Sequence, residues 1–75
     1  MPEKQKKLVI KADITIIHDD PEHLTIPQLI TLKQLITEGA LEAMTSATGF
    51  MRGWFKAKTL VHQYTQEIEK GKEFE

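Results

Sequence analysis

The stretch KKLVIKADITII, residues 6–17, carries an apolar side chain at every second position from residue 8 to residue 16. One set of alternate positions is apolar throughout: Leu8, Ile10, Ala12, Ile14 and Ile16. Because successive side chains of an extended chain point to opposite sides, this period of two predicts a β-strand with one buried face. The other set, which includes Lys11, Asp13 and Thr15, is mixed. Such a mixture is typical of an antiparallel strand that keeps one face in solvent.

The remainder of the chain offers this strand little to pair with. Residues 18–23, HDDPEH, carry the Asp-Pro pair typical of a turn. Residues 24–26 could form only a short second strand, because Pro27 has no N–H to continue the pairing. A bare apolar strand edge promotes aggregation unless another chain covers it. The sequence therefore predicts an oligomer interface, most simply with a second copy across a two-fold axis, made by Leu8, Ile10, Ile14 and Ile16.

From residue 26 onward the pattern becomes helical. Thr25 and Gln28 fit a capping box, and Pro27 falls in the first turn, where helices tolerate proline. Apolar or small residues then recur every three or four positions as far as Ile68. Two interpretations remain open at this point. Either one long kinked helix covers about residues 26–70, or two helices are separated by a break at TSATG, residues 45–49.

The expected fold is therefore α+β, with a long N-terminal strand followed by helical structure and completed by oligomerisation. The 75 residues are expected to form one domain, 1–75, with a flexible basic tail at 1–6 and a flexible tail at 71–75. A domain this small hides only about 60% of the surface of its unfolded chain. No disulfide can compensate, because the chain contains no cysteine.

The overall charge favours no particular class of partner. A net charge of −1 gives no general attraction to nucleic acid or to an anionic membrane. No apolar run reaches the length needed to cross a bilayer. We therefore expect no membrane association and a cytoplasmic protein.

The segment GFMRGWFKAK, residues 49–58, combines aromatic and basic side chains. Aromatic and arginine side chains dominate the binding energy of protein interfaces, because they bury large areas and can stack. Trp54 lies on the helical stripe, where packing in a core would also explain it, but Phe55 lies off that stripe. The candidate partner-binding residues are Arg52, Trp54, Phe55 and Lys56.

These features predict a small, non-enzymatic, oligomeric binding protein with a regulatory, adaptor or assembly role, whose partners are itself and another protein. The alternative is a nucleic-acid-binding regulator of dimeric strand-helix-helix type that uses Lys4, Lys6, Lys7 and Lys11. That order of elements resembles the ribbon-helix-helix repressors, in architecture alone and with no shared motif. The resemblance implies that paired strands enter the DNA major groove. Asp13 would then lie on the face that meets the negatively charged groove.

Residues suited to catalysis or metal binding are few. With no cysteine, one serine (Ser46) and no glycine-rich phosphate loop, the chain offers no candidate nucleophile site, so we expect no enzymatic activity and no cofactor. His18 and His23 flank acidic residues and are weak candidates for metal ligands. A turn explains the same residues, so no metal site is expected.

Overall fold

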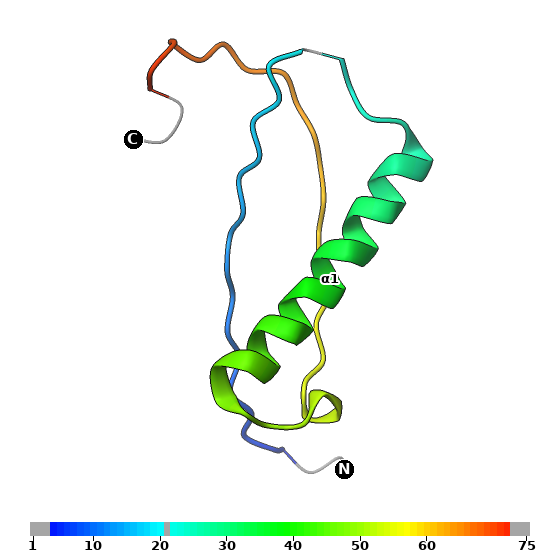
Figure 1. Cartoon of the computed structure of the whole chain (residues 1–75), viewed down its shortest axis with the longest axis vertical. Helices are drawn as coiled ribbons and strands as arrows, with labels where there is room; N and C mark the ends of the chain where they lie inside the picture. The colour runs from blue at the N-terminus through cyan, green and yellow to red at the C-terminus, as the bar shows by residue number, and fades with distance from the viewer. Residues whose placement is uncertain (1–3, 21, 73–75) are drawn as a thin grey trace.

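A single helix, α1 (Ile26–Thr48), dominates the fold (Figure 1). The structure is a computed structural model that describes residues 4–20 and 22–72. Within these ranges the only other regular element is a short 3-10 turn, η1 (Arg52–Trp54). Residues 1–3 and 73–75, which belong to the two tails predicted to be flexible, lie outside the described residues.

Extended chain flanks the helix on both sides. We call residues 4–18 the N-terminal segment and residues 55–70 the C-terminal segment. Both segments run from the end of the molecule that holds η1 towards the end that holds the start of α1 (Figure 1). The helix α1 lies between these two segments in the sequence and runs in the opposite direction to both (Figure 1).

The helix begins where the sequence predicts. Thr25 has an extended backbone (φ −72°, ψ 162°), and its hydroxyl accepts a hydrogen bond of 3.4 Å from the Gln28 N–H. The Gln28 side chain in turn accepts one of 2.9 Å from the Thr25 N–H. Pro27 lies in the first turn, where the missing N–H of proline leaves no helical bond unmade. The predicted capping box is confirmed.

Gly49 ends α1. Its backbone is left-handed (φ 75°, ψ 3°), and its N–H donates to the carbonyl of Thr45 at 2.8 Å. Glycine adopts this conformation without the steric penalty that a Cβ would bring, so it is the usual residue just past a helix. The helix therefore stops inside the predicted break at residues 45–49. The interpretation as one continuous helix over residues 26–70 is wrong.

The prediction of a second helix after the break is also wrong. Phe55 has an extended backbone (φ −114°, ψ 146°), and no helix follows it in the described chain. Three odd-numbered side chains of the C-terminal segment bond to the helix or to the loop before it: Thr59 to Thr37, Gln63 to Leu24, and Thr65 to His23. Because alternate residues of extended chain share a side, these bonds turn the odd-numbered side chains towards α1.

The N-terminal segment has an extended course but is not a strand. No hydrogen bond joins residues 4–17 to any other residue that the structure describes. A strand needs a hydrogen-bonded neighbour about 4.8 Å away, and the described chain does not supply one. The short strand at 24–26 is absent too, because Ile26 is the first residue of α1. The α+β prediction is therefore wrong, and with it the architectural resemblance to ribbon-helix-helix repressors.

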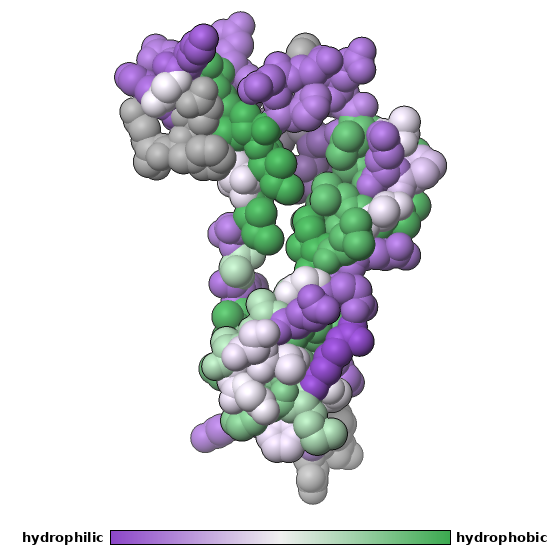
Figure 2. Space-filling model, in the orientation of Figure 1, coloured by the Kyte–Doolittle hydropathy of each residue, from purple (hydrophilic) through white to green (hydrophobic). Residues whose placement is uncertain are grey.

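The described chain has no buried core, since none of its residues is fully buried. Partial cover falls on Ile17 of the N-terminal segment, on one side of α1 and on odd positions of the C-terminal segment. In the last two it is found chiefly at Leu29, Leu32, Ile36, Leu41, Met44, Phe55, Thr59 and Val61. In Figure 2 the hydrophobic surface forms separate bands over the extended chain and over α1, with an opening between them. The radius of gyration is 16.5 Å, against about 11 Å for a compact domain of this length.

Candidate functional site

The predicted partner-binding residues lie in and just after the turn that follows α1. Gly49 reverses the chain, and η1 then carries Arg52 and Trp54. The ring of Phe50 lies 5.1 Å from that of Trp54 and 6.5 Å from that of Phe55, between ring centroids. Such separations are typical of favourable aromatic pairs. Phe50 is thus the centre of a three-ring group, which we call the aromatic cluster (Phe50, Trp54 and Phe55).

Most of the aromatic cluster is open to solvent. Trp54 is 69% exposed and Phe50 is 51% exposed, whereas Phe55 is half-buried. This is the reverse of what the helical stripe suggests, because that pattern places Trp54 inside and Phe55 outside. The backbone changes from helical to extended at Phe55, so the helical period no longer decides which side chains are covered. The exposed face of the cluster therefore belongs to Phe50 and Trp54.

The basic residues beside the cluster differ in their contacts. Arg52 forms a salt bridge with Glu38 of α1, and both side chains remain more than half exposed. Exposed ion pairs contribute at most about 1 kcal/mol, so Arg52 can exchange Glu38 for another acidic group at little cost. Lys56 is exposed on an even position of the C-terminal segment.

Two of these contacts were not predicted from the sequence. The sequence shows Phe50 and Trp54 four residues apart on one apolar stripe. It does not predict the contact between their rings, because that contact depends on the turn after Gly49. Glu38 lies fourteen positions before Arg52. No local pattern links the two, because they meet only after the chain reverses.

The predicted oligomer-interface residues lie on the N-terminal segment and are strongly exposed. Relative exposure is 87% for Leu8, 62% for Ile10, and 66% for both Ile14 and Ile16. Val9 on the other face is 73% exposed. The segment therefore presents both its apolar side chains and its backbone N–H and C=O groups to solvent.

The lysines proposed for nucleic-acid binding are also exposed on this segment: Lys4, Lys6, Lys7 and Lys11. The start of the segment lies at the same end of the molecule as η1 (Figure 1). No described hydrogen bond or ion pair joins these lysines to the aromatic cluster or to Arg52.

His18 and His23 are held by separate contacts. The Nδ1 of His18 lies 2.8 Å from the carbonyl oxygen of Asp20, and the Nε2 of His23 is 3.1 Å from the Thr65 hydroxyl. Across residues 4–20 and 22–72, no three or more His, Asp or Glu side chains gather closely enough to hold a metal ion. The structure thus does not bring the two weak metal candidates into one site.

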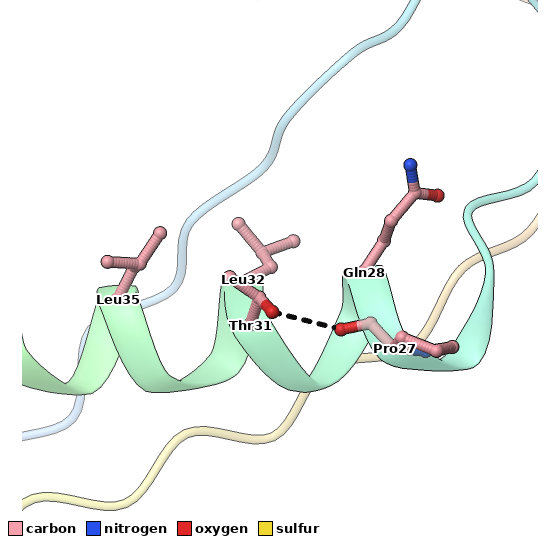
Figure 3. Close-up of a pocket in the computed structure, with 5 residues that line it drawn as sticks. All are labelled: Pro27, Gln28, Thr31, Leu32 and Leu35. Carbon is pink, nitrogen blue, oxygen red and sulfur yellow. Dashed lines mark hydrogen bonds between the residues drawn. The ribbon is translucent and has the colours of Figure 1, made fainter.

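Two shallow hollows on the described surface are lined by residues of α1 alone. The first, of about 360 Å³, is lined by Pro27, Gln28, Thr31, Leu32 and Leu35. Figure 3 shows Gln28, Leu32 and Leu35 pointing to one side of the helix, while the Thr31 hydroxyl donates to the Pro27 carbonyl at 3.1 Å. A second, of about 340 Å³, is lined by Ile30, Lys33, Gln34, Thr37 and Glu38. Neither hollow offers a set of converging polar groups to orient a small molecule.

Among the described residues, no helix combines the length and the apolar character needed to cross a bilayer. The chain matches no protein-family model, no curated protein sequence and no solved structure.

Proposed function

We propose that the protein is a small, non-enzymatic binding protein that acts as a homo-oligomer and presents the aromatic cluster to a protein partner. The role is regulatory, adaptor or assembly. The observation that carries the proposal is the amount of surface that one chain leaves in contact with water.

A single chain exposes 7859 Å², whereas a compact monomer of 8.6 kDa exposes about 4,700 Å². The excess is about 3,200 Å² per chain. A stable interface of standard size needs only about 800 Å² from each partner, and obligate assemblies use more. One chain therefore has enough uncovered surface for an obligate interface with a copy of itself and for a second partner.

The kind of surface also supports self-association. Fifteen large hydrophobic side chains are exposed among the described residues, from Leu8 to Ile68. Soluble monomers seldom expose large continuous apolar areas, and those that do use them for binding. The N-terminal segment adds unpaired backbone groups to this surface, which makes it a site for main-chain pairing with another chain.

The aromatic cluster supports a role for a further protein partner. Phe50 and Trp54 provide an exposed aromatic face beside Arg52 and Lys56. Tryptophan and arginine are over-represented among residues that dominate protein interfaces. The salt bridge from Arg52 to Glu38 leaves the Arg52 side chain more than half exposed.

Matched charge substitutions test the oligomer. Ile14→Asp puts a carboxylate on the apolar side of the N-terminal segment, whereas Thr15→Asp puts it on the mixed side, one residue away. Burying an unpaired charge is costly, so Ile14→Asp should yield monomer or unfolded chain and Thr15→Asp should keep the wild-type oligomer. Size-exclusion chromatography with light scattering measures the mass. Equal behaviour of the two variants would contradict an interface on the apolar side.

The alternative function is nucleic-acid binding. Measuring the affinity for DNA at increasing salt concentration distinguishes it from the proposed protein-protein role. A protein that neutralises phosphates with lysine loses affinity steeply as salt rises. We expect no binding of duplex DNA at physiological salt, because Asp13 lies among the lysines and the net charge is −1. Binding that falls steeply with salt, and that is lost on replacing Lys4, Lys6, Lys7 and Lys11 by alanine, would favour the alternative.

A further inference from the structure

We infer that the N-terminal segments of two copies pair antiparallel in a single register centred on Ala12. This inference rests on the proposed homo-oligomer and adds to it the partner, the orientation and the residue at the two-fold axis. The fold of each single chain stays as described above.

The sequence of the segment is self-complementary about Ala12. In a symmetric antiparallel pair, residue i faces residue 24 − i when Ala12 faces its own copy. The apolar side then pairs completely, with Leu8 facing Ile16 and Ile10 facing Ile14 of the other copy. Pairing with a second copy requires this self-complementarity, whereas pairing with a partner of unrelated sequence does not. The symmetry therefore favours a second copy as the partner.

The charges select the same register. On the other side of the segment, Lys11 faces Asp13 of the second copy, and Asp13 faces its Lys11. Opposite charges directly across an antiparallel pair are stabilising, and like charges are destabilising. The pairing therefore gains two cross-chain ion pairs at the centre of the contact.

Neighbouring registers lose this match. An odd shift would bring apolar side chains to the polar side, because side chains alternate with a period of two. A shift to a centre at residue 11 puts Lys11 against Lys11, and a centre at residue 13 puts Asp13 against Asp13. A parallel arrangement in register also places each charge against its own kind. Only the centre at Ala12 pairs all the apolar residues and both charges.

The structure leaves the segment free for this contact. Residues 4–17 make no hydrogen bond to the rest of the described chain, and Leu8, Ile10, Ile14 and Ile16 are each more than 60% exposed. The segment is thus already extended, with its backbone groups unpaired. A second copy satisfies these groups through main-chain hydrogen bonds, the same kind of bond by which peptides add a strand to the exposed edge of a sheet.

Cysteine cross-linking tests the register, because the chain contains no cysteine of its own. Disulfides need Cα atoms within about 7 Å of each other. In Ala12→Cys the two new thiols face each other across the axis, so mild oxidation should convert most of the protein to a covalent dimer on a non-reducing gel. In Ile14→Cys the two thiols lie roughly 14 Å apart along the pair, so this matched variant should stay uncrosslinked.

The double variant Ile10→Cys/Ile14→Cys restores facing thiols and should cross-link again. Sedimentation of the unmodified protein at the same concentration separates two kinds of failure. If the protein is dimeric and Ala12→Cys does not cross-link, or Ile14→Cys does so equally, the register is wrong and the homo-oligomer stands. If the protein is monomeric, the homo-oligomer itself is wrong and the register with it.

Discussion

The side-chain amide of Gln63 exchanges two hydrogen bonds with the backbone of Leu24. The Leu24 N–H donates to Gln63 Oε1 at 2.8 Å, and Gln63 Nε2 donates to the Leu24 carbonyl at 2.9 Å. This is the pair of bonds that a neighbouring strand would make through its backbone. Here a side chain makes them, so the C-terminal segment is held beside the start of α1 without forming a sheet.

Replacing Gln63 by alanine should therefore release the end of the C-terminal segment. Each hydrogen bond contributes about 1 kcal/mol, and exposure to water reduces that value. Hydrogen exchange at the Leu24 amide measures the effect and should become faster in Gln63→Ala. Gln66→Ala is the control, because Gln66 lies on the even side of the segment and should leave Leu24 unchanged. Equal exchange in the wild type and Gln63→Ala would show that this bond pair is not maintained in solution.

Two glycines, Gly49 just past the end of α1 and Gly39 in its interior, should respond oppositely to alanine. Gly49→Ala places a Cβ on a left-handed residue (φ 75°) and should lower helix stability by about 1 kcal/mol. Gly39→Ala lies within α1, where the new Cβ meets nothing within 4 Å, and should raise it by about 0.5–1 kcal/mol. Thermal unfolding followed by circular dichroism, at one fixed protein concentration, measures both. A gain in stability for Gly49→Ala would contradict the helix end at Thr48.

The N-cap of α1 gives a third test. Thr25→Ala removes the acceptor for the Gln28 N–H and should cost about 0.5–2 kcal/mol. Thr31→Ala is the matched control. The Thr31 hydroxyl donates to the Pro27 carbonyl inside the helix, and a bond of this kind does not stabilise a helix. We expect lower helix content by circular dichroism for Thr25→Ala alone. If both variants behave alike, the capping box contributes nothing measurable.

The helix was predictable because its signals are local. Thr25, Gln28 and Pro27 mark its start, and Gly49 supplies the left-handed residue at its end. The C-terminal segment was not predictable in the same way, because residues 55–65 fit both a helical period and a period of two. Contacts distant in sequence decide between them: Thr59 with Thr37 at 2.6 Å, and Gln63 with Leu24.

The candidate site shows the same division. The aromatic and basic residues between Gly49 and Lys58 predict a binding segment from composition alone. Which of them is exposed depends on the backbone at Phe55, and this reverses the expected positions of Phe55 and Trp54. For residues 6–17 the alternation predicts a β-strand, and that prediction is wrong although the chain there runs extended. The alternation does not provide the second backbone that would make that chain a strand.

Charge exchange tests the register independently of cross-linking. Lys11→Asp places an aspartate against Asp13 of the second copy at two symmetric positions, and should weaken the dimer by about 1–2 kcal/mol, or roughly 5- to 30-fold. The double variant Lys11→Asp/Asp13→Lys restores opposite charges and should recover most of the affinity. Analytical ultracentrifugation at low salt measures the dissociation constants. No recovery in the double variant would contradict the pairing of Lys11 with Asp13.

The homo-oligomer itself is tested most directly by sedimentation equilibrium of the unmodified protein over a dilution series. We expect a mass of at least two chains of 8.6 kDa at high concentration, falling towards one chain on dilution with a parallel loss of helix content. This coupling follows because stability and association are inseparable in an obligate oligomer. A chain that sediments as a folded monomer at every concentration, with unchanged helix content, would contradict the proposed oligomer.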